Sequence, residues 1–180
     1  TIAQLQALEV ACVLAGVPYQ VLGRAPFYER REHRVLQWYV DLAQHLDVPL
    51  NDALAQAMLR VANVPMRGVA SDTLKHVVRQ GQAAGWTVRE TFVQLLNAVT
   101  PQSTAHARID DWVALLESLQ RQLEAGVSAY ELLSGLVQSL RLDEHFLRAF
   151  GRGEAALERT HAVRHLIAVV EHLAVPAQEF

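Results

Sequence analysis

Apolar residues recur at three- and four-residue steps along nearly the whole chain, which is the period of helices with one buried face. The first stripe runs from Ile2 to Ala15. Further stripes cover positions 35–46, 54–61, 74–78, 92–99, 109–123, 132–140, 146–150 and 157–173. Only the segment from Val17 to Leu22 fits a strand. The pattern predicts an all-α fold, a compact multi-helix domain of eight or nine helices with at most one short extended segment.

Proline and capping residues divide these stripes into separate helices. Asn51 or Asp52 is placed to cap the helix that Pro65 ends. Ser71 and Thr87 are placed to cap the next two helices. The later helices follow a turn at positions 101–104, and Ser128 is placed at the start of one of them. The connections are short, so we expect residues 1–180 to form a single domain.

Composition narrows the class of protein. Apolar residues make up 51% of the 180 residues and charged residues 19%, which excludes intrinsic disorder. Charges interrupt every apolar run before the roughly 18 residues that a membrane span needs, so no membrane partner is expected. The net charge of −3 provides no global basic field, and any nucleic-acid binding must be local. The single cysteine, Cys12, fits a core position and a cytoplasmic location.

No enzymatic signature is present. The sequence has no phosphate-binding Gly-x-x-x-x-Gly-Lys loop and no Gly-x-Ser-x-Gly motif. The acidic pairs Asp110-Asp111 and Asp143-Glu144 are expected in the first turn of a helix, where carboxylates complement the helix dipole. His161 and His165 have the i, i+4 spacing of a zinc site, but eight histidines in a helical chain readily produce such a pair. We therefore expect no catalytic residue and no metal in this chain.

The segment from Asn63 to Lys75 has the pattern of a phosphate-contacting turn. A helix stopped by Pro65 leads through Gly68 into a new helix. Glycine allows close approach of the backbone to a ligand, and the amides of a first helical turn point outward with the positive end of the dipole. Arg67 and Lys75 add positive charge on either side. The alternative is structural, with Arg67 bonded to the carbonyls of the preceding helix and Ser71 acting only as a cap.

Several short motifs follow one another in an order that carries a family resemblance. They lie at positions 4–9, 16–19, 23, 27–32 and 63–69, with weaker matches at 164–166 and 178–180. The order resembles the UvrD/Rep/PcrA family of superfamily-1 DNA helicases. That family has Gln-Ser-Arg-x-x-Glu, Gly-Ile-Pro-Tyr, a glycine, Phe-Phe-Glu-Arg-x-Glu and then Asn-x-Pro-x-Arg-Gly-Ile-Gly. Two positions depart from it: Gln6 replaces the arginine of the first motif, and the last glycine is Ala70.

The resemblance implies that residues 1–180 form the 2B subdomain, cut from a longer helicase chain. In the family this subdomain is a helical insertion in the second RecA-like motor domain. It contacts the duplex ahead of the fork, swivels on hinges and regulates unwinding. The ATPase motifs lie outside it, so no cofactor is expected here, whereas ATP and magnesium are expected in the parent, an ATP-dependent 3′–5′ helicase of the DNA-repair type.

Two functional hypotheses follow. The leading one is a regulatory subdomain that contacts the backbone of double-stranded DNA near a junction, with the parent's motor domains as further partners. Its expected DNA-binding residues are Arg67, Gly68, Val69, Ala70, Ser71, Thr73 and Lys75. The alternative is a helical protein-interaction or autoinhibitory module without direct DNA contact, which docks an accessory protein. In that case Trp38, Trp86 and Trp112 are the side chains whose exposure matters, since aromatic residues concentrate at interface hot spots.

Overall fold

The fold is all-α, as the apolar pattern predicts. A computed structural model of the chain describes residues 8–9, 11–12, 15–20, 30–173 and 177. Eight helices are defined within these residues: α2 (Arg31–Gln44), α3 (Asp52–Val61), α4 (Ser71–Ala84), α5 (Val88–Asn97), α6 (Thr104–Glu124), α7 (Ala129–Leu140), α8 (Leu142–Phe150) and α9 (Glu154–Leu173). The described segments contain no strand, only an isolated bridge between Pro49 and Thr87.

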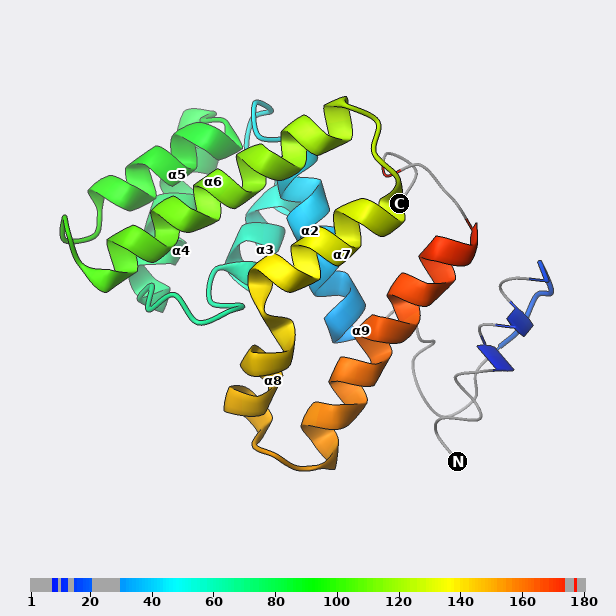
Figure 1. Ribbon diagram of the computed structural model, residues 1–180. Helices are drawn as coiled ribbons and strands as arrows, with labels where there is room; N and C mark the ends of the chain where they lie inside the picture. The colour runs from blue at the N-terminus through cyan, green and yellow to red at the C-terminus, as the bar shows by residue number, and fades with distance from the viewer. Residues whose placement is uncertain (1–7, 10, 13–14, 21–29, 174–176, 178–180) are drawn as a thin grey trace.

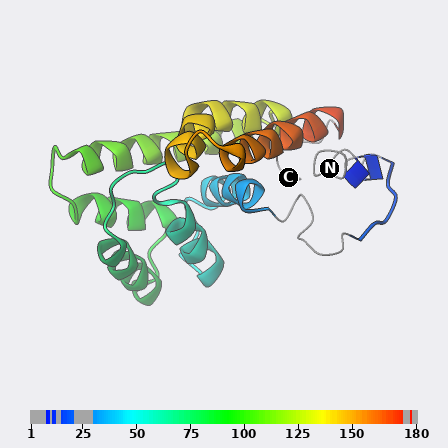
Figure 2. The same cartoon turned by 90° about the horizontal axis from the view of Figure 1, so that it is seen from below.

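Helix α2 lies at the centre and contacts α3, α6, α7 and α9 (Figure 1). Helices α4 and α5 gather at one end of the long helix α6, and α8 and α9 form a hairpin at the other end of the molecule. Helices α3 and α4 project to one side of the remaining helices (Figure 2). The connection between α3 and α4 therefore lies where this projecting pair joins the rest of the domain.

Most positions of the predicted stripes form the core, but Leu147, Phe150 and Leu157 are exposed. The largest fully buried side chains are Trp112, Tyr39, Phe92, Leu36, Leu42, Leu46, Met58, Leu95, Ile109, Leu116, Leu119 and Leu132. Trp112 of α6 is central, because its ring meets Phe92 of α5 edge to face at 4.6 Å and Tyr39 of α2 at 6.4 Å between centroids. Such edge contacts add to the stabilisation from burial. Trp112 is thus a core residue rather than an interface residue, while Trp38 and Trp86 are half-buried.

The predicted caps are correct for α3, α5 and α7. Asn51 accepts a hydrogen bond from the Leu54 amide, and Thr87 and Ser128 each form a reciprocal capping box with a glutamate. The assignment of Ser71 as a cap is wrong, because Ala70 holds the extended cap position of α4 without a side-chain bond. Ser71 is the first helical residue instead.

Asp143 and Glu144 lie in the first turn of α8 as predicted, whereas Asp110 and Asp111 do not begin a helix. Helix α6 starts earlier, at Thr104, where Ser103 accepts from the His106 amide. The serine cap ahead of the apolar stripe was the better indicator of where this helix begins.

Other expectations from the sequence can be compared with the structure only in part, because some of their residues are not described. Gly23 and the match at 178–180 lie outside the described residues, as do most of the first apolar stripe and much of the motifs at 4–9 and 27–32. The part of the proposed extended segment that is described, residues 17–20, is not a strand. Among the described residues, no group of three or more potential metal ligands comes together, including around His161 and His165. None of the described helices is long and apolar enough to cross a membrane.

Two glycines in helices are expected to respond to alanine with opposite signs. A Cβ at Gly81 of α4 would lie 2.8 Å from Thr91 Oγ1 and 3.2 Å from Leu50 Cδ2. The Thr91 hydroxyl cannot move away without losing its bond to the Thr87 carbonyl. We predict that Gly81→Ala lowers the free energy of unfolding by about 1–3 kcal/mol through overpacking, measured by urea denaturation.

Gly135→Ala on α7 is the matched control. A Cβ there meets nothing within 4 Å, so the change should raise the free energy of unfolding by about 0.5–1 kcal/mol through helix propensity. Equal effects of the two substitutions would show that α4 and α5 do not pack as described.

Candidate nucleic-acid interface

The candidate loop is the connection from α3 to α4, residues 62–70, and its arginine points inward. Arg67 is only 5% exposed. Its Nη1 donates to the carbonyl oxygens of Val61 at 3.0 Å and Ala62 at 3.1 Å. Its Nη2 donates to the Tyr39 hydroxyl at 2.5 Å, and that hydroxyl donates to the Val64 carbonyl at 2.6 Å. Arg67 thus bonds to the C-terminus of α3 in the way that the structural alternative describes.

The buried charge of Arg67 is stabilised by dipoles and aromatic rings. No carboxylate in the described part of the chain forms an ion pair with it. The guanidinium instead lies at the negative end of the α3 dipole, with its carbon 4.5 Å from the Trp112 ring centroid and 5.7 Å from that of Tyr39. A buried cation needs such compensation, since its desolvation is costly. Arg67 therefore joins α2, α3 and α6 at one point.

Asn63 fixes the rest of the loop. Its Nδ2 donates to the Val69 carbonyl at 2.9 Å, and its Oδ1 accepts from the amides of Val69 at 3.2 Å and Arg67 at 3.3 Å. Val69 is also buried, at 4% exposure, and packs in the core. The side chains of two expected DNA-binding residues, Arg67 and Val69, hence face the interior.

The opposite side of the loop faces solvent. Gly68 is exposed and has a φ of 76°, a conformation that glycine adopts without strain. Ala70, Ser71 and Lys75 are exposed and Thr73 is half-buried. Four of the seven expected residues are thus exposed where the loop leads into the first turn of α4. We call this stretch, residues 68–75, the α4 edge.

The α4 edge carries hydrogen-bond donors. Within the described residues, no intramolecular partner is found for the amides of Ser71, Asp72 and Thr73, as is usual in a first helical turn. Lys75 adds a positive charge one turn later, while the Asp72 carboxylate adds a negative one. The edge can therefore receive one or two phosphate oxygens, in competition with a resident carboxylate.

Ala70 does not disturb this turn, although the resembling family has glycine there. Its φ of −64° and ψ of 132° are ordinary extended values that any residue adopts. The left-handed position of the turn is Gly68 alone. The Cβ of Ala70 therefore causes no backbone strain.

The sequence contained signals for some of the residues that build this site, but not for all. Asn63 lies in the motif that carries the family resemblance, yet its bonds to the loop backbone were not anticipated. Tyr39 lies in a predicted core stripe, and Trp112 was expected either in the core or at an interface. Nothing in their spacing indicates that they surround a cation. Arg67 lies 28 positions from Tyr39 and 45 positions from Trp112 in the sequence. Helical periodicity gives no information about contacts over such separations.

Burial also shifts the ionisation of Tyr39. Removal from water raises the pKa of Tyr39 to about 12, and the neighbouring Arg67 charge and hydrogen bond act in the opposite direction without cancelling the effect. The phenol thus remains protonated over a wide pH range. This keeps its proton available for the Val64 carbonyl and its oxygen available to accept from Arg67.

Comparison with known proteins points to DNA helicases. No family model matches the chain. It is 27% identical over 121 residues to the ATP-dependent DNA helicase UvrD1 of Mycobacterium tuberculosis, covering 66% of this chain and 15% of the relative. It is 27% identical to the ATP-dependent DNA helicase srs2 of Schizosaccharomyces pombe (79% and 16% covered) and 23% to PcrA of Bacillus subtilis (88% and 20%).

These matches confirm the resemblance to a segment of UvrD-type helicases. The chain spans only about a sixth to a fifth of the length of these relatives. Their names describe whole ATP-dependent enzymes, so the similarity makes this chain a helicase-related region.

We predict that Arg67→Ala is strongly destabilising. The change leaves several buried carbonyls without a donor and opens a cavity beneath Trp112, so the free energy of unfolding should fall by about 3 kcal/mol or more. Urea denaturation measures this. Arg79→Ala removes an equal charge from an exposed position of α4 and should stay within about 0.5 kcal/mol of the wild type. Similar small effects for both would contradict the buried position of Arg67.

The raised pKa of Tyr39 predicts a loss of stability in alkali. Below pH 10 the phenol is protonated in both the folded and the unfolded chain, so its contribution is constant. Between pH 10 and about 12 the unfolded chain releases this proton while the folded chain keeps it. The free energy of unfolding should therefore decline by about 2–3 kcal/mol across that window. In Tyr39→Phe this part of the decline should disappear; an unchanged slope would count against the assignment.

Proposed function

We propose that this chain is a duplex-contacting, regulatory 2B-like subdomain of an ATP-dependent 3′–5′ DNA helicase of the UvrD type. The proposal assigns residues 1–180 to one subdomain of a longer chain. The parent's motor domains are its permanent partners and supply the sites for ATP and magnesium. The 180-residue chain itself is proposed to have no catalytic residue.

The observation that carries the proposal is the division of the α3–α4 loop into a fixed inner side and an exposed outer side. Arg67 and Asn63 hold the loop backbone from within. Gly68 and the first turn of α4 are left facing solvent. A backbone held in advance can bind a phosphate without losing conformational freedom on contact.

The chemistry of the α4 edge favours the DNA backbone over the bases. Main-chain amides at a helix N-terminus and a single lysine recognise phosphate oxygens, and neither feature distinguishes one base from another. Contact at this edge would therefore be independent of sequence, as a subdomain that follows a moving fork requires. Because the whole chain has a net charge of −3, binding by the isolated chain should be weak and sensitive to salt.

The regulatory part of the proposal rests on similarity and on the missing ATPase motifs. The matched helicases are about five to seven times longer than the segment that resembles this chain. A helical region without a phosphate-binding loop can influence such a motor only through its position and its contacts. We propose that this region regulates the motor by binding or releasing the duplex at the α4 edge.

Fluorescence anisotropy with a labelled duplex–single-strand junction tests the α4 edge. Lys75→Ala should weaken binding and reduce the slope of log K against log salt by about 0.9, the value for one lost phosphate contact. Lys75→Arg, which keeps the charge, should bind nearly as the wild type does. Asp72→Asn should bind more tightly, because it removes the competing carboxylate from the same turn.

Arg121→Ala is the matched control, since it removes one exposed positive charge from the far end of α6. It should leave both the affinity and the salt slope close to their wild-type values. The proposal fails if Lys75→Ala and Arg121→Ala have the same effect, or if Asp72→Asn leaves the affinity unchanged.

A further inference from the structure

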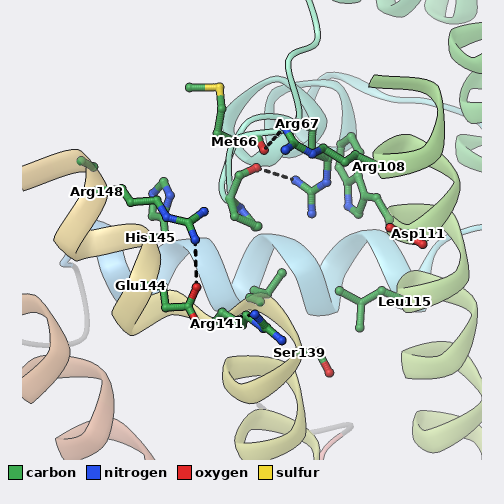
Figure 3. Close-up of a pocket in the computed structure, with 14 residues that line it drawn as sticks. Met66, Arg67, Arg108, Asp111, Leu115, Ser139, Arg141, Glu144, His145 and Arg148 are labelled. Atoms are coloured by element: carbon green, nitrogen blue, oxygen red, sulfur yellow. Dashed lines mark hydrogen bonds and ion pairs between the residues drawn. The ribbon is translucent and has the colours of Figure 1, made fainter. Parts of the chain in front are cut away.

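A groove of about 660 Å³ opens beside residues 65–67 of the α3–α4 loop (Figure 3). It lies between residues 65–67, helix α6 and the corner where α7 meets α8. Apolar side chains line it from three directions: Met66 from the loop, Leu115 from α6 and Leu140 from the end of α7. Met66 is 65% exposed, so apolar surface is accessible at the lip of the groove. Its volume lies within the range of about 300–1,000 Å³ that is typical of ligand-binding pockets.

The groove is positively charged in a chain that is negatively charged overall. Its lining includes four arginines, Arg67, Arg108, Arg141 and Arg148, against two carboxylates, Asp111 and Glu144. Figure 3 shows Arg108 and Asp111 on the α6 side and Glu144 and Arg148 on the α8 side. This surplus of positive charge contrasts with the net charge of −3 of the whole chain.

The arginines of the rim are not fully neutralised. Glu144 is shared between Arg148, at 3.0 Å, and Arg141, at 3.6 Å. Arg108 makes only a long contact of 3.4 Å to the Met66 carbonyl, and no ion pair to it is found in the described part of the chain. At least two exposed guanidinium groups can therefore accept additional carboxylates.

His145, which also lines the groove, responds to this positive charge. Burial is the main cause of the lowered pKa of His145, and the charges of Arg31, Arg67 and Arg148 lower it further. A ligand that brings negative charge into the groove would offset the arginine contribution. His145 thus provides a spectroscopic probe of occupancy.

We infer that this groove docks an acidic, amphipathic segment of a partner protein. Apolar side chains of the segment pack on Met66, Leu115 and Leu140, and its Asp or Glu carboxylates pair with Arg108 and Arg141. Peptide recognition of this kind combines an apolar anchor with charges that fix orientation. The docking site shares no residue with the α4 edge and does not depend on DNA contact.

A protein segment fits the groove better than a nucleic acid does. A phosphate backbone has no apolar groups to pack on the Met66, Leu115 and Leu140 side chains of the lining. Binding of unpaired bases usually relies on exposed aromatic faces, and the one tryptophan in the lining, Trp112, is 1% exposed. An apolar lining beneath arginines instead matches leucine-type side chains flanked by carboxylates.

Arg141 allows binding and folding to be separated. It has a φ of 45°, in the left-handed region that is strained for arginine and relaxed for glycine. We expect Arg141→Gly to raise the melting temperature and at the same time to weaken binding of an acidic peptide. A residue with a purely structural role would not lose binding while the protein becomes more stable.

The experiment uses the 180-residue chain and a fluorescein-labelled peptide of 14 residues in which leucines recur at three- and four-residue steps between glutamates. Arg108→Glu should weaken binding of this peptide by about tenfold or more, as expected when a charge pair at an interface becomes repulsive. The matched control Arg121→Glu, on the same helix but outside the groove, should change the affinity less than twofold. Peptide binding should also raise the pKa of His145 in an NMR titration.

Control peptides define the chemistry of the partner. A peptide with lysines in place of the glutamates, and one with the leucines scrambled, should both bind at least tenfold more weakly. The proposal is overturned if the acidic peptide does not bind, or if Arg108→Glu and Arg121→Glu affect it equally. It is also overturned if the junction DNA, rather than the peptide, loses binding in Arg108→Glu and Arg141→Gly. Loss of duplex binding in Lys75→Ala alone tests the proposed DNA contact at the α4 edge and has no bearing on peptide binding in the groove.

Discussion

The structure depends on one buried guanidinium. Arg67 brings a full positive charge into the centre of the domain, where the C-terminal carbonyls of α3, the Tyr39 hydroxyl and the Trp112 ring surround it. A charge in this place is tolerated only if every donor finds an acceptor, since unpaired buried polar groups are costly. The requirement fixes three helices and the α3–α4 loop relative to one another. The loop owes its shape to this interior contact together with the bonds of the Asn63 side chain to the loop backbone.

That constraint holds the backbone of the two surfaces for which we propose functions. On one side, the backbone from Gly68 into the first turn of α4 is exposed and held ready for a phosphate. On the other side, residues 65–67 form a wall of the arginine-rich groove beneath α8. Arg67 therefore serves both faces without contacting a ligand at either of them. A partner in the groove would contact residues 65–67, and a duplex at the α4 edge would contact the residues that follow them in the chain.

Helical periodicity predicts which face of each helix is buried, and this is enough to predict much of the architecture. Thus the stripe from Ile109 to Leu123 and the caps Thr87 and Ser128 are found where expected. The failures occur where distant segments decide the outcome. An arginine beside a glycine turn fits a DNA contact equally well until the positions of Tyr39 and Trp112 are known, and these come from helices far away in the sequence. The groove was not anticipated either, because its arginines come from three separate elements.

The most direct test is NMR of the arginine guanidinium groups in the presence and absence of junction DNA. The account predicts that the two Nη groups of Arg67 give separate signals, because hydrogen bonds to carbonyls and to Tyr39 slow rotation about the Nε–Cζ bond. These signals should not move when DNA is added, whereas the Lys75 ammonium signal should shift. Rapidly rotating Nη groups in the free protein, or Arg67 signals that move with DNA while those of Lys75 do not, would contradict the account.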